Sequence, residues 1–230
     1  MKVLICSLLL ICGAIAFRTQ STGVKGKLVC GSKAATGVNL KLFDEDNGPD
    51  PDDVLDQKTT DNEGNFFLSG SSMELTPIDP ELRIFHDCND QGSPCQREWV
   101  IRIPAKYITN GPEVKEIMDL GVLNLEVKGV FRCGTESAKG PDPDDDLGNG
   151  FTDANGAFEL SGHTSELTTI DPHLKVYHDC DDGINPCQRR WKFELPNNYI
   201  FSDSDAPKTL DIGIWNLEGV LPGESRDCDH

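Results

Sequence analysis

Residues 78–103 read IDPELRIFHDCNDQGSPCQREWVIRI, and residues 170–195 read IDPHLKVYHDCDDGINPCQRRWKFEL. These stretches belong to a longer repeat. Residues 48–126 align with residues 140–218 at a constant offset of 92 without a gap, and 38 of the 79 aligned pairs are identical. A repeat of this length indicates a duplicated domain, since the repeating units of solenoid proteins are shorter.

Upstream of this aligned block the two copies differ in length. Cys30 matches Cys133 at an offset of 103, and between that cysteine and the shared Gly-Pro-Asp motif the copies have 17 and 6 residues, so the second lacks 11. The missing stretch includes the counterpart of residues 38–43, VNLKLF, whose alternation of apolar and polar residues predicts a half-buried strand. We therefore expect two tandem domains, 17–126 and 127–230, the second lacking one strand near its N-terminus.

The other strand candidates are short, and Gly, Pro, Asn and Asp residues typical of turns separate them. In the first copy they span residues 27–30, 65–68, 82–86, 98–103 and 121–125. Hairpin turns are expected at residues 61–65 and 153–156, where Gly64 and Gly156 supply a positive φ at no steric cost. Several short strands in about a hundred residues predict an all-β, two-sheet sandwich for each copy.

Residues 1–16 have the pattern of a secretory signal peptide. Lys2 precedes an apolar run, and the small residues Ala14 and Ala16 precede the expected cleavage point. The apolar run is shorter than the ~20 residues that a bilayer-spanning helix needs. The sequence therefore predicts a secreted, extracellular protein that does not span a membrane.

The net charge restricts the class of partner. Without residues 1–16, 20 basic and 39 acidic residues give 20 − 39 = −19. Binding to nucleic acid or to an anionic bilayer requires clustered Lys and Arg side chains, which an excess of carboxylates opposes. We therefore expect no nucleic-acid partner.

The cysteines predict disulfides in an oxidising compartment. Seven follow the expected leader: Cys30, Cys88, Cys95, Cys133, Cys180, Cys187 and Cys228. We expect local pairs Cys88–Cys95 and Cys180–Cys187 across short loops, and Cys133–Cys228 closing the second copy, with Cys30 unpaired. Other pairings remain compatible with the sequence, and the odd number requires at least one thiol that is free or bonded to another chain.

No catalytic, cofactor-binding or metal-binding residues are predicted. The sequence contains neither a Gly-x-Ser-x-Gly nor a His-Glu-x-x-His motif. The two histidines that both copies share, His86 and His178, are expected at strand ends, hydrogen-bonded to a neighbouring loop. Trp99 and Trp191, which occupy matching positions, are expected to anchor the core or a sheet face.

The acidic residues 44–53, DEDNGPDPDD, permit two interpretations, a weak extracellular calcium site or a solvated loop. They depart from an EF-hand loop, because Gly48 comes one place early and Leu55 stands where the bidentate Glu belongs. We favour the solvated loop.

An ordered set of motifs resembles the nematode transthyretin-like family of secreted proteins. The motifs are FRTQS (17–21), VKGKLVCG (24–31), KLFDED (41–46), LSG (68–70), IFHDC (84–88), PCQR (94–97), Pro104 with Tyr107 and Ile108, and the ending PGESRDC (222–228). The resemblance covers essentially the whole chain after residue 16. It implies transthyretin-like (prealbumin-like) β-sandwiches, extracellular residence and no established enzymatic activity. The chain departs from the usual family pattern in being tandem, in lacking a strand and in lacking a terminal cysteine in the first copy.

Two functions follow as hypotheses. The first is an extracellular binding or adaptor protein that recognises an extracellular or cell-surface protein, with the missing strand leaving an edge suited to β-augmentation. The alternative is a carrier of a small hydrophobic ligand, such as a lipid or a hormone-like molecule. Hydrolysis of 5-hydroxyisourate, known in a related fold, is not expected, because the chain ends in RDCDH where that hydrolase has YRGS.

Overall fold

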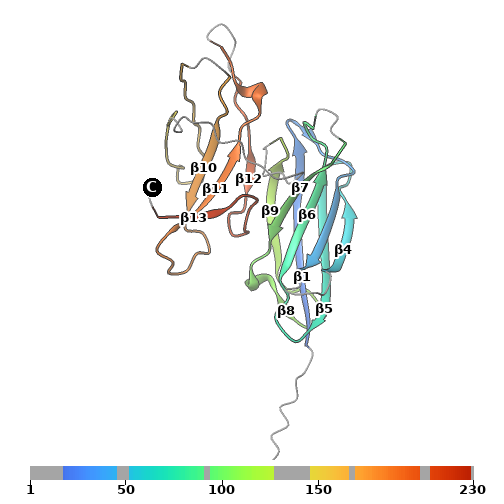
Figure 1. Ribbon diagram of the computed structural model, residues 1–230. Helices are drawn as coiled ribbons and strands as arrows, with labels where there is room; N and C mark the ends of the chain where they lie inside the picture. Colours follow the sequence, from blue (N-terminus) through green and yellow to red (C-terminus); the bar gives the residue numbers. More distant parts are fainter. Residues whose placement is uncertain are drawn as a thin grey trace, which may run out of the picture.

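Figure 1 shows the computed structural model of the chain, which describes residues 18–45, 52–90, 94–126, 146–165, 169–202 and 208–228. The regular structure in these residues is almost entirely β, with two short 3-10 helices, Ala105–Tyr107 (η1) and Asn197–Tyr199 (η2). The predicted all-β class is therefore confirmed. The expected leader, residues 1–16, and most of the acidic stretch lie outside the described residues.

The first copy is a sandwich of two sheets. In one sheet the long central strand β1 (Arg18–Cys30) pairs with β2 (Lys33–Ala34), β5 (Asn65–Glu74), β8 (Thr109–Asn110) and, in parallel, β9 (Ile117–Asn124). The other sheet has the antiparallel order β4 (Asp53–Thr59), β3 (Asn39–Asp44), β6 (Pro80–His86), β7 (Arg97–Arg102). All six strands expected in the first copy are present, although β1 begins well before the predicted residue 27.

The core of the first copy lies between these two sheets. Leu40 and Leu42 of β3 are fully buried, and in the sheet register they lie opposite Ile84 and Leu82 of β6. Burying one such side chain contributes about 1.5–3 kcal/mol relative to leaving it exposed. The strand that the second copy lacks is thus a central strand of the first copy, paired on both sides and packed against the core.

The second copy contains a smaller sheet. Its order is β10 (His173–His178), β11 (Gln188–Glu194), β13 (Ser225–Asp227), and β10 and β11 are the counterparts of β6 and β7. In the place where β3 lies beside β6, no strand among the described residues lies beside β10. The predicted loss of one strand from the second sandwich agrees with this sheet.

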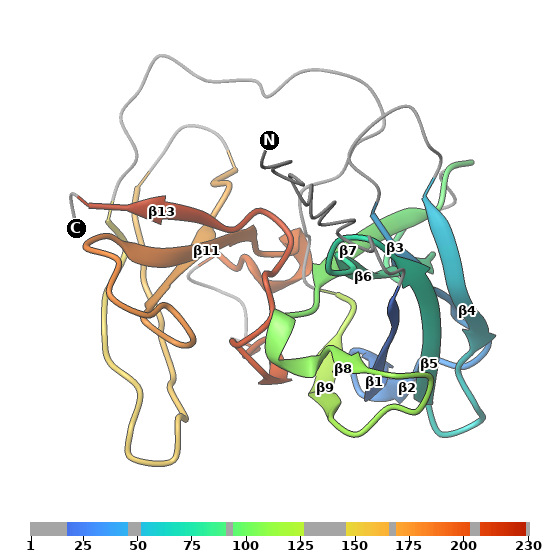
Figure 2. The same cartoon turned by 90° about the horizontal axis from the view of Figure 1, so that it is seen from below.

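Residues 146–165 correspond to β4 and β5 of the first copy, but they form no strand. Figure 2 shows them as the yellow, hairpin-like trace outside the sheets. The predicted turns do form in both copies, because Asp153 N–H donates to Ala157 O at 2.8 Å as Asp61 N–H donates to Asn65 O at 3.0 Å. The local turn therefore persists where the long-range strand pairing is lost.

The two copies meet through β12 (Gly213–Trp215) of the second copy, which pairs antiparallel with β9 and extends the first copy's sheet. Trp215 contacts Trp99 of the first copy and Trp191 of the second, with ring centroids 5.2 and 4.5 Å apart. Trp99 and Trp191 are 1% and 2% exposed, which confirms their prediction as core residues. Buried residues of both copies form one continuous hydrophobic cluster.

Candidate functional site

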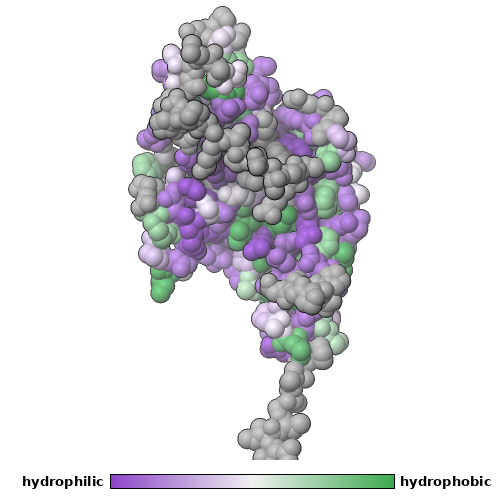
Figure 3. All heavy atoms as spheres, viewed as in Figure 1, coloured by the Kyte–Doolittle hydropathy of each residue, from purple (hydrophilic) through white to green (hydrophobic). Residues whose placement is uncertain are grey.

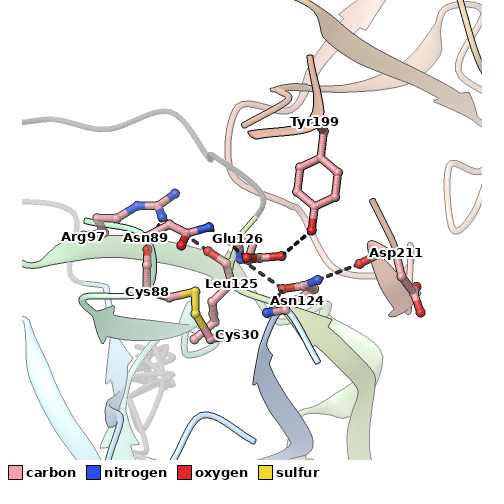
Figure 4. Close-up of a disulfide and its surroundings, with 10 residues drawn as sticks. Cys30, Cys88, Asn89, Arg97, Asn124, Leu125, Glu126, Tyr199 and Asp211 are labelled. Carbon is pink, nitrogen blue, oxygen red and sulfur yellow. Dashed lines mark hydrogen bonds between the residues drawn. A yellow bond between two sulfur atoms is a disulfide. The ribbon is translucent and has the colours of Figure 1, made fainter. Parts of the chain in front are cut away.

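A disulfide joins Cys30, the last residue of β1, to Cys88, two residues after the end of β6, and these strands belong to different sheets (Figure 4). The Cα atoms lie 5.8 Å apart, within the usual range for a disulfide. The prediction that Cys88 pairs with Cys95 and leaves Cys30 unpaired was therefore wrong. The two bonded cysteines are 58 residues apart in sequence, and their proximity arises from sheet packing that loop spacing does not reveal.

A second disulfide joins Cys187, just before β11, to Cys228, just after β13. These strands pair antiparallel with Gln188 opposite Asp227, so the residue before one strand meets the residue after the other. This pairing corrects two predictions, Cys180 with Cys187 and Cys133 with Cys228.

The remaining cysteines differ in environment. Cys180 carries a free thiol among the described residues, and burial raises its pKa. Cys95 is exposed, and Cys133 lies outside the described residues. The described disulfides thus include Cys30, which was predicted to be unpaired.

A buried arginine organises the same corner of each copy, and sequence reasoning missed this role. Arg97 donates from its guanidinium to the carbonyls of Cys88 and Leu125 at 2.5 and 3.3 Å, and its counterpart Arg189 donates to those of Cys180 and Leu217 at 2.6 and 3.0 Å. The recurrence of arginine at the end of both Pro-Cys-Gln-Arg motifs was the available signal. These arginines hold a strand against the cysteine loop.

In the second copy the arginine of this corner forms a buried ion pair with Glu224. Glu224 accepts two hydrogen bonds from Arg189, at 2.5 Å to Nε and 2.9 Å to Nη2, and both side chains are 6% exposed. Burial lowers the pKa of Arg97 to about 10 in the first copy. The C-terminal segment therefore closes the second copy with a buried bidentate ion pair.

The shared histidines end β6 and β10, as predicted, but their surroundings differ. His86 is 2% exposed and packs edge-on against Trp99, and neither ring nitrogen has a hydrogen-bond partner in the described part of the chain. The expected hydrogen bond of His86 is thus absent there, and burial, followed by the charge of Arg97, lowers its pKa to about 3. His178 is half-buried and accepts a hydrogen bond from Cys180 N–H at 3.3 Å.

The outer edge of β10 is the candidate interaction site. On one side β10 pairs with β11, and no described strand pairs with the other side. Leu174 and Val176 are half-buried, whereas their counterparts Leu82 and Ile84 are fully buried beside β3. A strand at the edge of a sheet is a template for pairing with another strand.

The face shown in Figure 3 presents no alternative apolar interaction site of comparable extent. On the face shown in Figure 3, hydrophobic residues form separate spots among hydrophilic ones. Single exposed apolar side chains, such as Phe151 at 99% and Ile184 at 101% exposure, are ordinary on protein surfaces. A broad apolar docking patch is not evident on this face.

A cleft of about 380 Å³ lies between the copies. Six of its ten lining residues are charged, namely Arg102, Asp181, Arg189, Glu218, Glu224 and Arg226. Within the described ranges, no cluster of three or more His, Cys, Asp or Glu side chains could hold a metal ion, and no helix is long and apolar enough to cross a membrane.

Comparison with known proteins identifies the family of the two repeated copies. The sequence model of the transthyretin-like family (TTR-52) matches residues 25–104 and 128–196, one segment in each copy. The chain belongs to the transthyretin-like family. The two matched segments agree with tandem transthyretin-like domains.

Relatives in Caenorhabditis elegans match about one copy. Transthyretin-like protein 5 is 50% identical over 112 residues, covering 49% of this chain and 81% of the relative. Transthyretin-like protein 46 is 50% identical over 112 residues, covering 48% and 63%, and transthyretin-like protein 33 is 43% identical over 126 residues, covering 54% and 88%. Among solved structures, a 9R-lipoxygenase from Cyanothece matches with 22% identity and a TM-score of 0.25 over 46% of this chain and 16% of the lipoxygenase.

Proposed function

We propose that this transthyretin-like chain is a secreted, non-enzymatic binding or adaptor protein that recognises an extracellular or cell-surface protein by accepting one of its segments as a strand beside β10. The observation that carries this proposal is the contrast between β6, which has a strand on both sides, and β10, which has one described neighbour. Main-chain hydrogen bonds would provide affinity, and alternate side chains would provide specificity.

The first copy indicates what the bound segment should look like. Leu40 and Leu42 of β3 lie opposite Ile84 and Leu82, whose counterparts on β10 are Val176 and Leu174. The partner segment should therefore run antiparallel to β10 and place apolar side chains at alternate positions, facing Val176 and Leu174. In this position it would cover the two half-buried side chains.

The outer face of the second copy's sheet adds a charge preference. Lys175 of β10 lies directly opposite Lys192 of β11 in the register. Two cations side by side on a sheet disfavour a third and favour an acidic side chain in the neighbouring strand. An extended segment that is apolar on one face and acidic on the other fits this edge best.

A labelled peptide with the sequence of residues 38–45, VNLKLFDE, tests the proposal against residues 17–230 of the chain by fluorescence anisotropy. Saturable binding is expected, and it should strengthen when the peptide's Lys41 is replaced by Glu. A peptide with proline in place of Leu42 is the control, because proline cannot supply the ladder hydrogen bond.

The matched protein control is a filled-in chain in which residues 134–139 are replaced by residues 31–47, which restores the missing strand. This variant should bind the peptide at least tenfold more weakly than the natural chain. Equal binding to both chains, or no saturable binding to the natural chain, would overturn the proposal.

The alternative function, carriage of a small hydrophobic ligand, gains little support from the cleft between the copies, because this cleft is open to solvent and six of its ten lining residues are charged. Apolar ligands are usually held in pockets lined mainly by hydrophobic and aromatic side chains. Extraction of a bound lipid from the purified protein would nevertheless favour the carrier function over the adaptor function.

A further inference from the structure

The contact between the two copies is symmetric in its backbone. Gly213 pairs with Leu123, Ile214 with Val122, and Trp215 with Gly121. Under the repeat offset of 92, Gly121 corresponds to Gly213 and Val122 to Ile214, so exchanging the copies maps this register onto itself. An interface with this property is isologous, as in a two-fold symmetric homodimer.

The side-chain contacts around β9 and β12 also occur twice. Tyr107 donates its hydroxyl proton to Glu218 at 2.5 Å, and its counterpart Tyr199 donates to Glu126 at 2.9 Å. Each contact joins the tyrosine that ends one copy's 3-10 helix to the glutamate that ends the aligned block of the other. Figure 4 shows the Tyr199–Glu126 half of this arrangement.

Asparagines provide a second reciprocal pair. Asn124 Nδ2 donates to the carbonyl of Asp211 at 2.6 Å, and its counterpart Asn216 Nδ2 donates to the carbonyl of Asp119 at 2.9 Å. Within each copy the asparagine Oδ1 accepts the N–H two residues later, at 3.1 Å for Asn124 and 3.0 Å for Asn216. In each asparagine the side-chain oxygen therefore accepts a hydrogen bond within its own copy, and the side-chain nitrogen donates one across the interface.

The close approach of the two strands depends on glycine in both copies. Gly121 and Gly213 have φ values of 78° and 85°, which glycine adopts readily. A Cβ atom at Gly121 would lie 2.4 Å from Ile214 O, and one at Gly213 would lie 2.2 Å from Val122 O. Both positions therefore exclude a side chain for the same reason.

We infer that β9 is a self-complementary homodimerisation edge, which β12 of the same chain occupies and which a second copy of the chain can occupy instead. The first copy alone carries both members of every reciprocal contact: Tyr107 and Glu126, Asn124 and Asp119, and Gly121. Two β9 strands from separate chains would therefore pair with Val122 opposite Val122 on the two-fold axis. Each Tyr107 would then donate to Glu126 of the other chain.

The intact chain favours the internal pairing, because the linker makes the association intramolecular and raises the effective concentration of β12. Replacing Ile214 with proline should release β9, since proline in the middle of β12 removes a donor from the ladder. Ile214 is 72% exposed, so the substitution removes little packing. The released chain should associate through β9 in a concentration-dependent manner.

The test is a cysteine crosslink at the proposed axis in the full chain. Opposed residues in an antiparallel pair have Cα atoms ~4.5–5.5 Å apart, a distance that a disulfide spans. The V122C/I214P chain should form a disulfide-linked dimer on a nonreducing gel, at least fivefold more than V122C alone, in which β12 still occupies the edge. The V122S/I214P chain controls for crosslinks through the natural cysteines.

A V122C/I214P chain that keeps its native circular dichroism but gives no more dimer than the serine control would overturn the inference. If the proline variant loses its native fold, a V122C/N216A/E218A chain takes its place, because it removes the Asn216–Asp119 and Tyr107–Glu218 hydrogen bonds across the interface without a proline. The same excess of dimer is expected from it, and the absence of that excess would again overturn the inference.

Discussion

The strands β6 and β10 come from the same repeated sequence and differ in burial. In β6 five of seven residues are buried, whereas in β10 exposed and half-buried residues alternate. Their sequences, PELRIFH and PHLKVYH including Pro172, keep the same apolar pattern. The apolar pattern is therefore sufficient to form a strand with an inward face, whereas full burial of that face also requires a neighbouring strand, which β3 provides for β6.

The largest expected effect concerns the buried arginine corners. Replacing Arg189 with leucine should lower the free energy of unfolding by about 3–5 kcal/mol, because it leaves the Glu224 carboxylate buried without its counter-charge. Replacing Arg97 with leucine should also destabilise the chain, by about 1–3 kcal/mol or more, because the buried carbonyls of Cys88 and Leu125 lose their donor. Urea unfolding followed by tryptophan fluorescence measures both losses, and a loss below about 1 kcal/mol for Arg189→Leu would show that the buried ion pair is not needed for stability.

The next effect concerns the pH dependence of stability at the two matching histidines, His86 and His178. Because burial lowers the pKa of His86 to about 3, the folded state keeps this side chain neutral while the unfolded chain takes up a proton below about 6.5. The stability that depends on neutral His86 is present above pH 6.5 and is lost as the pH falls toward 3. Between pH 7 and pH 4.5 this histidine should cost about 2.5 kcal/mol.

Urea unfolding of the natural chain and of His86→Phe at both pH values isolates this contribution, since the carboxylates titrate in both chains. Burial also lowers the pKa of His178, but this side chain is only half-buried. His178→Phe should therefore reduce the pH dependence less than His86→Phe. The reverse order would show that burial does not distinguish the two copies.

A smaller effect is expected at Trp215, whose counterpart in the first copy is Leu123. Trp215→Leu makes the two sides of the interface more alike and removes ring contacts with Trp99 and Trp191. Two such aromatic contacts contribute about 1–3 kcal/mol beyond their buried area. The variant should keep the β9–β12 pairing. The amide protons of Val122 and Ile214 should therefore remain comparably protected from hydrogen exchange. A loss of this protection would indicate that Trp215 is required for the pairing.

Much of the fold follows from the sequence because its signals are local. Period-two alternation located β3, and the glycine turns at residues 61–65 and 153–156 form in both copies. The repeat offset anticipated the absence of a strand beside β10. The family resemblance followed from ordered motifs and is confirmed by the matches in both copies.

The features that escaped prediction depend on long-range geometry. The Cys30–Cys88 bond requires the ends of strands from two different sheets to meet, whereas the spacing of Cys88 and Cys95 suggested a local loop. The reciprocal contacts of Tyr107 and Tyr199 are visible only when the copies are placed together, although both tyrosines are conserved in the repeat. The sequence carries these residues without indicating which of them will touch.

The smallest effect concerns an ion pair that breaks the symmetry of these contacts. Lys106 Nζ lies 2.6 Å from Glu218 Oε1, whereas the counterpart of Lys106 in the second copy is Asn198. Lys106→Asn should lower the melting temperature slightly, and Asn198→Lys should raise it slightly by placing a cation near Glu126. Because salt screens exposed charges, the shift from Lys106→Asn should largely disappear at about 1 M NaCl, whereas the shift from Asn198→Lys should shrink less, since Glu126 is buried. Opposite shifts of similar size would indicate that the two halves of the interface are electrostatically equivalent, whereas a shift from Lys106→Asn alone would show that the second copy holds Asn198 away from Glu126.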